Sequence, residues 1–166
     1  MPVALRLAAP ADFVTVADLA QRVWWAHYPA ILPAAQITYM LERGYSQAAL
    51  RDLVARPHGG IALAEDGEPV GFAAWHGVPE PATLKLDKLY VLPERHGEGI
   101  GRLLIGHVVE QARASGCRQV ILNVNRQNTS AIRTYERCGF AIRAAGDFPI
   151  GNGFVMEDFI MARPLD

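Results

Sequence analysis

The stretch Leu84–Leu104, LKLDKLYVLPERHGEGIGRLL, constrains the fold more than any other part of the chain. Its first part is rich in apolar and aromatic residues and contains no Gly or Pro, which predicts a strand that ends before Pro93. Three glycines follow, and a helical spacing of apolar residues begins at Ile100. The unpaired N–H groups and the dipole at a helix N-terminus favour an anion. The order of strand, glycine loop and helix therefore predicts a phosphate or pyrophosphate site.

Two common nucleotide-binding loops do not match this stretch. In a dinucleotide fingerprint, Gly97 and Gly99 would be followed by a third glycine at the position that Arg102 occupies. A Walker loop ends in Gly-Lys-Ser/Thr, whereas this loop ends in Gly101-Arg102-Leu103. A glycine-rich turn can also be only a tight connection. Taken alone, the stretch predicts an anion site and leaves the ligand open.

Composition narrows the class of protein. The 166 residues, 51% of them hydrophobic, are enough for one domain with a sizeable core, expected over residues 1–166. A net charge of −1 and the lack of a basic run argue against a nucleic-acid partner. Cys117 and Cys138 suit neither a disulfide framework nor a metal site, so we expect reduced thiols and no bound metal. No apolar run approaches membrane-spanning length, so we expect a cytoplasmic protein without a membrane partner.

The remaining pattern predicts a mixed α/β fold. Strands are expected at Val3–Leu7, Ile61–Glu65, Pro69–His76, Gln119–Asn125, Phe140–Arg143 or slightly beyond, and Phe154–Ala162. Helices are expected from Pro10 to near Pro29, at Pro33–Arg43, at Ser46–Arg56 and at Asn128–Cys138. Asp66-Gly67 predicts a hairpin between two of the strands. This order is typical of a mixed sheet with helices on both faces.

Two motifs together resemble the GNAT acetyltransferase superfamily over essentially the whole chain. The first is LYVLPERHGEGIGRLL, similar to that family's strand, glycine loop and helix for the pyrophosphate of acetyl-CoA. The second is LNVNRQNTSAIRTYERCGF, similar to its N-x-x-N-x-x-A-x-x-x-Y-x-x-x-G-F pattern. The resemblance implies the GNAT fold, a mostly antiparallel mixed sheet that splays between the fourth and fifth strands.

The resemblance also implies which residues hold acetyl-CoA. The pyrophosphate would be bound by the loop residues His96, Gly97, Glu98, Gly99, Ile100, Gly101 and Arg102. Main-chain groups of Leu89, Tyr90 and Val91, with the Asn128 side chain, would hold the pantetheine arm. His96 departs from the family pattern, which usually has Gln or Arg there, and imidazole can still donate to a phosphate. Asn128 also suits a helix N-cap without any ligand.

Three residues are candidates for the chemistry. The resemblance places Tyr135 near the sulfur, as the acid that protonates the leaving thiolate; at helical spacing it could also be a core residue. An alkylammonium must lose a proton before it attacks, and Asp87 is the first candidate for that base, with His27 second. Asp87 could instead be a solvated partner of Lys88, and His27 a packing residue. Glu157 and Asp158 are weaker candidates.

These observations imply direct acetyl transfer from acetyl-CoA to a primary amine. The segments HYPAILPAAQITYML and DFPIGNGFVMEDFIMARPL resemble a subgroup that includes enzymes acting on polyamines, so a small cationic acceptor is expected. Glu157 and Asp158 could attract such an amine, although consecutive strand residues point to opposite faces. A peptide or protein N-terminus as acceptor, and a non-catalytic acyl-CoA-binding sensor, remain alternatives. Exposed last strands in this family often pair, so a homodimer is possible.

Overall fold

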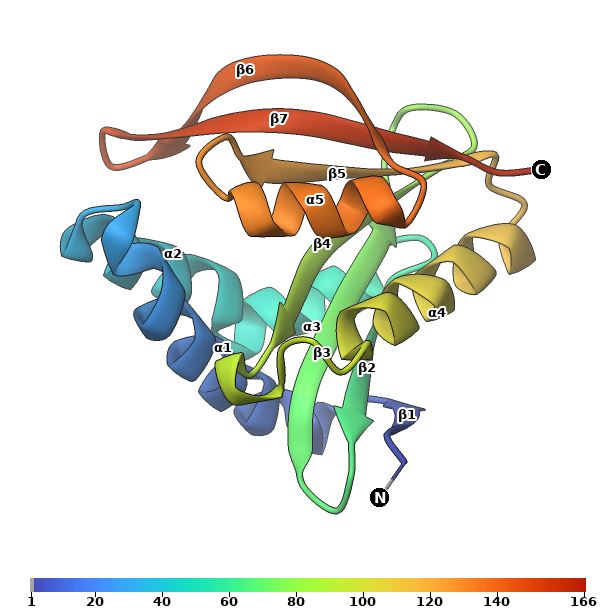
Figure 1. The fold of residues 1–166 in the computed structure, drawn as a ribbon, viewed down its shortest axis with the longest axis horizontal. Helices are drawn as coiled ribbons and strands as arrows, with labels where there is room; N and C mark the ends of the chain where they lie inside the picture. The colour runs from blue at the N-terminus through green and yellow to red at the C-terminus, as the bar shows by residue number, and fades with distance from the viewer. Residues whose placement is uncertain (1) are drawn as a thin grey trace.

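The computed structural model describes residues 2–166 and contains one seven-stranded sheet in the order β1-β2-β3-β4-β5-β7-β6 (Figure 1). Only β4 and β5 run parallel; the other neighbours are antiparallel. The strands are β1 (Ala4–Leu7), β2 (Gly60–Glu65), β3 (Pro69–Gly77), β4 (Thr83–Val91), β5 (Gln119–Asn125), β6 (Ala141–Gly151) and β7 (Phe154–Pro164).

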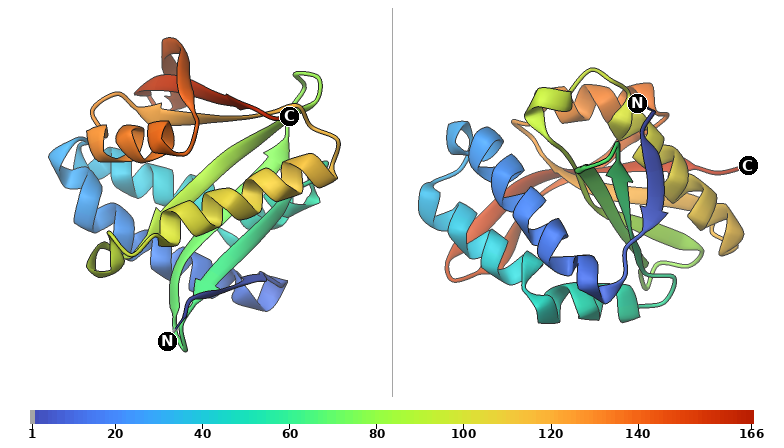
Figure 2. Two further views of the ribbon diagram at one scale, coloured as in Figure 1. Left: turned by 45° about the vertical axis from the view of Figure 1, so that its right-hand side comes forward. Right: turned by 90° about the horizontal axis from the view of Figure 1, so that it is seen from below.

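Helices cover both faces of the sheet (Figure 2). They are α1 (Phe13–His27), α2 (Ala34–Tyr45), α3 (Gln47–Ala55), α4 (Ile100–Ala114) and α5 (Thr129–Arg137), with short 3₁₀ turns at Pro10–Asp12, Tyr28–Ala30 and Pro93–Arg95. On β3, Phe72 packs edge-on against Tyr45 of α2, whereas Trp75 packs against His107 of α4. The first three helices therefore lie on one face and α4 on the other. Within residues 2–166, no helix is long and apolar enough to span a membrane.

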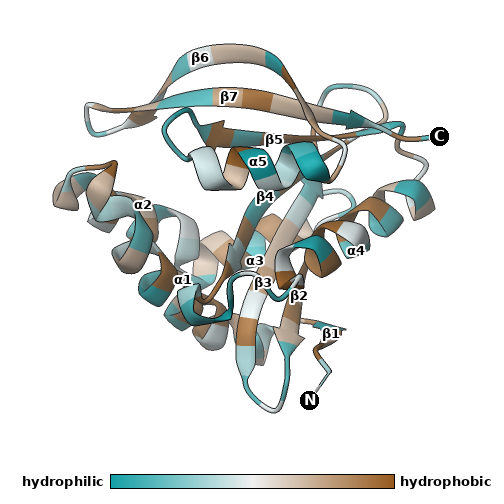
Figure 3. Ribbon diagram, in the orientation of Figure 1, coloured by the Kyte–Doolittle hydropathy of each residue, from teal (hydrophilic) through white to brown (hydrophobic). Residues whose placement is uncertain are grey.

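The core lies between these layers. Its fully buried large residues come from the helices as well as the central strands, and include Phe13, Ile37, Leu50, Leu63, Phe72, Leu84, Leu104 and Leu122. The helices carry both apolar and hydrophilic residues (Figure 3). This mixture is expected where one helix face rests on a sheet and the other faces water.

The parallel pair β4–β5 splays apart after a short contact. The two strands pair only over Thr83–Lys85 and Gln119–Ile121, at the start of each strand. Beyond Lys85, β4 stays paired with β3, and β5 stays paired with β7. Figure 1 shows the two strands diverging. The facing edges of both strands therefore carry main-chain groups without a strand partner, as the GNAT resemblance implied.

Most predicted elements are confirmed, with one clear difference in length. The strand at Gln119–Asn125 has the predicted bounds, and the Ser46 hydroxyl caps α3 by accepting a hydrogen bond from the Ala49 amide at 3.1 Å. The strand predicted at Phe140–Arg143 or slightly beyond is present but was predicted too short, because β6 runs from Ala141 to Gly151. The sequence did not predict this continuation, because Gly146 and Pro149 are residue types that are unfavourable inside a strand. Proline is tolerated in this position because β6 is an edge strand, and its register with β7 shifts beside Pro149.

Candidate active site

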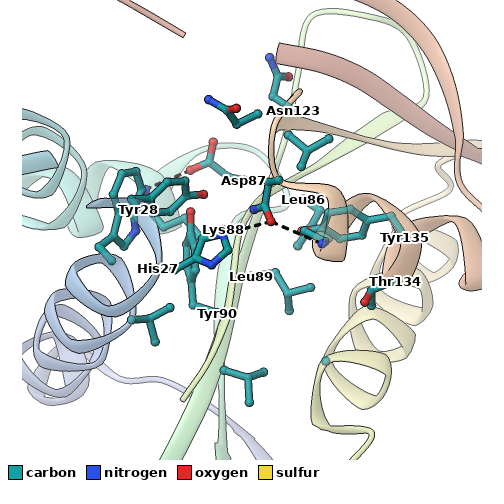
Figure 4. Close-up of a pocket in the computed structure, with 18 of the residues that line it drawn as sticks. His27, Tyr28, Leu86, Asp87, Lys88, Leu89, Tyr90, Asn123, Thr134 and Tyr135 are labelled. Carbon is teal, nitrogen blue, oxygen red and sulfur yellow. Dashed lines mark hydrogen bonds and ion pairs between the residues drawn. The ribbon is translucent and has the colours of Figure 1, made fainter. Parts of the chain in front are cut away.

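A cleft of about 1360 Å³ lies where β4 and β5 separate. Its walls come from the ends of α1 and α2, from β4, from the glycine loop at Gly97–Arg102, from α5 and from the β6–β7 hairpin. Figure 4 shows His27 and Tyr28 on one side and Tyr135 on the other, with residues of β4 between them. The cleft therefore brings together the residues of both sequence motifs.

The glycine loop presents the open N-terminus of α4 to this cleft. Gly97 and Gly99 have φ values of 86° and 81°, a conformation that strongly favours glycine. A Cβ added at Gly97, Gly99 or Gly101 would meet no atom within 4 Å, so the space above the loop is open. Arg95 braces the loop through ion pairs with Asp66 and Glu98. The Glu98 side chain is thus engaged by Arg95 and does not line the cleft, unlike Gly97 and Gly99 on either side of it.

The cleft is far more cationic than the chain as a whole. It is lined by eight cationic side chains, Arg43, Arg56, Lys85, Lys88, Arg95, Arg102, Arg133 and Arg137, and by three anionic ones, Asp52, Asp87 and Asp158. The chain carries a net charge of −1, so composition gave no sign of this concentration. Arg133 and Arg137 are four residues apart on α5, a spacing that places both on one side of the helix. That spacing was the available signal in the sequence, although neither arginine was among the predicted site residues.

His96 does not stand free above the loop. Its Nε2 lies 2.9 Å from the main-chain oxygen of Val91. A carbonyl oxygen can only accept, so Nε2 carries the proton and donates to it. The imidazole therefore ties the loop to the end of β4, and one of the main-chain groups expected to meet the pantetheine arm already has a partner. Only Nδ1 of His96 remains for another contact.

Asn128 is both the cap of α5 and the partner of His27. Its Oδ1 accepts a hydrogen bond from the Ala131 amide at 3.4 Å and lies 3.1 Å from His27 Nε2. Because the amide contact requires an oxygen at that position, His27 Nε2 is the donor to it. His27 thus spans the cleft from α1 to α5 and has only Nδ1 left to accept a proton. Asn128 itself lines the cleft.

Tyr135 is 9% exposed and lines the cleft from α5. Its ring packs at an angle against Phe140, with centroids 5.8 Å apart, so the second motif also builds part of the core. Burial raises the pKa of Tyr135 above its ordinary value, and the nearby Tyr28 and Cys138 add to the rise. The phenol therefore stays protonated at neutral pH and can donate a hydrogen bond.

A β-bulge turns two consecutive β4 residues toward the same face. Ala74 pairs with Lys88 and Trp75 with Leu86, which leaves Asp87 as the extra residue. Lys88 Nζ lies 3.3 Å from the Asp87 carboxylate and 4.4 Å from the centre of the Tyr45 ring. Without the bulge, alternation would send the two side chains to opposite faces. The bulge was not visible in the sequence, and it explains how Asp87 and Lys88 both enter the cleft.

Asp87 also contacts a buried histidine. His76 is 4% exposed; its Nδ1 lies 2.8 Å from the Gly77 carbonyl oxygen, and its Nε2 lies 3.1 Å from Arg56 and 3.5 Å from Asp87. Burial favours a raised pKa for Asp87, but the His76 contact and the charge of Lys88 outweigh burial and hold that pKa well below its usual range. Asp87 is therefore ionised at neutral pH and held by neighbours, rather than a freely solvated carboxylate.

Aromatic rings packed at tilted angles form the wall beside β4. The Trp24 ring lies 4.2 Å from Tyr28 and 5.9 Å from Tyr90, measured between centroids, and Tyr90 lies 5.8 Å from Phe72. Burial raises the pKa values of Tyr28 and Tyr90, so both phenols are neutral. The Tyr90 side chain thus belongs to the aromatic wall. Leu89 and Val91, its neighbours on β4, also line the cleft.

Glu157 and Asp158 are consecutive residues of β7 that differ in burial. Glu157 is exposed, whereas Asp158 is 6% exposed and lines the cleft. This confirms the expectation that one of the two carboxylates points away. It also shows which one faces the cleft, a question that alternation alone left open.

Comparisons with known proteins agree with this geometry. The Acetyltransferase (GNAT) family model matches residues 19–140. An uncharacterised N-acetyltransferase of Mycobacterium tuberculosis is 32% identical over 139 residues, covering 82% of this chain and 86% of that protein. The aminoglycoside N(6')-acetyltransferase type 1 of Stenotrophomonas maltophilia is 29% identical over 143 residues, covering 82% and 84%.

A solved structure shows the same fold. The crystal structure of PaiA N-acetyltransferase from Thermoplasma acidophilum, in complex with coenzyme A, has a TM-score of 0.84 to this chain. The match covers 99% of this chain and 100% of that one, at 22% sequence identity. The family match, the relatives and the shared mixed sheet lead to one conclusion: the chain belongs to the GNAT family and is an N-acetyltransferase.

Proposed function

We propose that residues 1–166 form a single cytoplasmic N-acetyltransferase domain that transfers acetyl directly from acetyl-CoA to a primary amine of a small, polyamine-like cation. The observation that carries this proposal is the open gap between β4 and β5, with the glycine loop and Tyr135 beside it and three carboxylates in the same cleft. The relative that acts on aminoglycosides, which carry several amino groups, supports a cationic acceptor. The free thiols of Cys117 and Cys138 suit a reducing compartment.

The residues around the gap fit coenzyme A. The amides of Gly97–Arg102 at the start of α4 would bind the pyrophosphate, with Arg102, Arg133 and Arg137 as nearby cations. The main chain of Leu89, Tyr90 and Val91 and the side-chain nitrogen of Asn128 would hold the pantetheine arm between the splayed strands. When bound, acetyl-CoA supplies the acetyl group as a reactive thioester.

Tyr135 would act on the leaving sulfur. A buried phenol with a raised pKa is a weaker acid than a thiol, whose ordinary pKa is about 8.5. Tyr135 would therefore stabilise the developing thiolate chiefly through a hydrogen bond, and the proton that the amine loses would neutralise the sulfur in the end.

Asp87 is the proposed base for the amine, acting directly or through one water. An alkylammonium has a pKa of about 10.4, so it must lose a proton before its nitrogen can attack. The depressed pKa of Asp87 makes the carboxylate a weak base but a strong electrostatic partner for the incoming ammonium. His27 would position Asn128 through its Nε2 hydrogen bond, and as a base it would have to use Nδ1.

The test is acetyl-CoA-dependent thiol release with a panel of diamines, polyamines, amino acids, aminoglycosides and peptides. We expect the highest kcat/KM with small polycationic amines. Turnover with peptide N-termini alone would show that the acceptor is a peptide or protein N-terminus and not a small polycationic amine. No thiol release with any amine would contradict the catalytic proposal. Tyr135→Phe separates an enzyme from a sensor: lost turnover with retained coenzyme affinity supports catalysis, whereas unchanged turnover removes the role of Tyr135.

A further inference from the structure

Asp158 is a buried carboxylate with an incomplete set of hydrogen bonds. It lies on β7 opposite Asn125 of β5 and Gly146 of β6, and it is 6% exposed. Its Oδ2 lies 3.5 Å from the side-chain nitrogen of Asn123, at the long limit of a hydrogen bond. Its Oδ1 has no partner among the described residues. This acceptor oxygen is thus buried and unpaired, in a residue that lines the cleft.

No cation of residues 2–166 satisfies this oxygen. Arg126 forms an ion pair with Asp147 at 2.9 Å, and Lys88 forms one with Asp87 at 3.3 Å. Lys85 lines the cleft and acts on Asp158 through its charge, but no Lys or Arg nitrogen lies within 4 Å of the carboxylate. A buried carboxylate without donors pays a large desolvation cost. Burial accordingly raises the pKa of Asp158, so the site favours any ligand that brings its own positive charge and donors.

The surroundings of Asp158 suit an aliphatic chain. Phe148, Ile150 and Met156 of the β6–β7 hairpin line the cleft together with Met40 of α2. Apolar walls next to one carboxylate match a ligand with methylene groups and an ammonium end.

Two contacts with α2 hold that hairpin in place. The Gln36 side-chain nitrogen donates to the Val155 carbonyl oxygen at 3.0 Å, and the Tyr39 hydroxyl donates to the Ile150 carbonyl oxygen at 2.8 Å. The walls around Asp158 are therefore preorganised by the fold.

We propose that Asp158 binds the non-reacting ammonium of an aliphatic diamine or polyamine, whose other amine reacts near Asp87 and Tyr135. This assignment rests on the proposed function and extends it by naming a residue that selects diamines over monoamines. The ammonium supplies donors to the Asp158 carboxylate, whose hydrogen bonds are incomplete, and its chain packs against Phe148 and Met156. Lys85 opposes this ammonium by charge repulsion, so its removal strengthens diamine binding.

The experiment compares 1,4-diaminobutane with 1-aminobutane in the wild type, in Asp158→Asn and in the matched control Glu157→Gln. Glu157 is the exposed neighbour on the same strand, so its variant removes one carboxylate charge without touching the cleft. The wild type should prefer the diamine in kcat/KM by about tenfold or more, as expected for a charge-assisted contact. Asp158→Asn should abolish most of that preference by raising KM for the diamine, and Glu157→Gln should keep the preference. Lys85→Met should lower KM for the diamine.

Binding is measured separately from turnover. Calorimetry with coenzyme A present should show 1,4-diaminobutane binding to the wild type and not to Asp158→Asn, while both proteins keep the same coenzyme affinity as evidence of folding. If the wild type binds the diamine but acetylates no amine, the catalytic proposal fails and the Asp158 site stands. Three results would contradict this assignment of Asp158. They are equal kcat/KM for the two amines in the wild type, an equal drop in kcat/KM for both amines in Asp158→Asn, and no binding of the diamine to the wild type.

Discussion

The two halves of the cleft are built in different ways. The half that we propose for the coenzyme consists of main-chain groups of one continuous segment, from the end of β4 through the glycine loop to the first turn of α4, with the start of α5 beside it. The acceptor half uses side chains from distant segments: Tyr28 after α1, Met40 on α2, Asp87 on β4 and Asp158 on β7. A main-chain site can bind the same cofactor whatever surrounds it, whereas a side-chain site changes with each substitution. We therefore expect the first half to be shared across the family and the second half to decide which amine is acetylated.

The largest effect is expected from Tyr135→Phe, at the boundary between the two halves. Loss of the phenol hydrogen bond should lower kcat by about 100-fold, since proton donors typically contribute at least this factor. The dissociation constant of acetyl-CoA should change less than about twofold, because in the proposed complex the phenol would face the sulfur and not the phosphates. Stopped-flow thiol release and coenzyme titration measure the two quantities. A large loss of coenzyme affinity with normal kcat would assign Tyr135 to binding.

Gly99→Ala should damage the coenzyme half alone. Its φ of 81° makes a side chain costly, by about 1–2 kcal/mol, and the strain falls on the loop itself. Gly116→Ala is the matched control, because Gly116 has a φ of 75°, equally open space and a position beyond the other end of α4. Both variants should lose similar thermal stability, but only Gly99→Ala should weaken coenzyme A binding, by about tenfold, or 1.4 kcal/mol. Equal affinity in both would remove the loop from the coenzyme site.

The two acidic residues of the acceptor half should respond to pH with opposite signs. The pKa of Asp87 is depressed, so its charge stabilises the fold above the unfolded value of about 3.9, and this gain is lost as pH falls toward the folded value. The pKa of Asp158 is raised, so ionisation costs stability as pH rises above about 3.9. Each pKa unit corresponds to about 1.4 kcal/mol.

Thermal unfolding at pH 3 and pH 7 measures this difference. Relative to the wild type, Asp87→Asn should lose Tm on going from pH 3 to pH 7, and Asp158→Asn should gain it. Matching shifts in the two variants would show that the carboxylates sit in equivalent surroundings and that the contrast between them is wrong.

The smallest effect is expected from His96→Arg. His96 donates to the Val91 carbonyl oxygen, so its main contribution is to hold the loop against β4. An arginine can keep that donor and add a charge for a phosphate. Coenzyme affinity should stay equal or rise by less than about fivefold, corresponding to about 1 kcal/mol. A large loss in a titration would show that the imidazole itself is needed.

The same difference explains what could be predicted from the sequence. The loop, the cap at Asn128 and the strand at Gln119–Asn125 depend on neighbouring residues, so local pattern reveals them. The bulge at Asp87 depends on pairing with β3, and the burial of Asp158 depends on β5, β6 and the helices that close the cleft. His27 and Asn128 are 101 positions apart and still share a hydrogen bond. Such contacts follow from tertiary packing, which periodicity and turn signals do not encode.

The most direct test of the account is a crystal structure of the chain with coenzyme A. We expect a pantetheine arm in the gap between β4 and β5, a pyrophosphate within hydrogen-bond distance of the Gly97–Arg102 amides, and a sulfur facing Tyr135 with Asp158 left free on the acceptor side. A coenzyme that lies outside the gap, or whose phosphates contact the Asp158 side of the cleft, would contradict the division of the cleft into two halves.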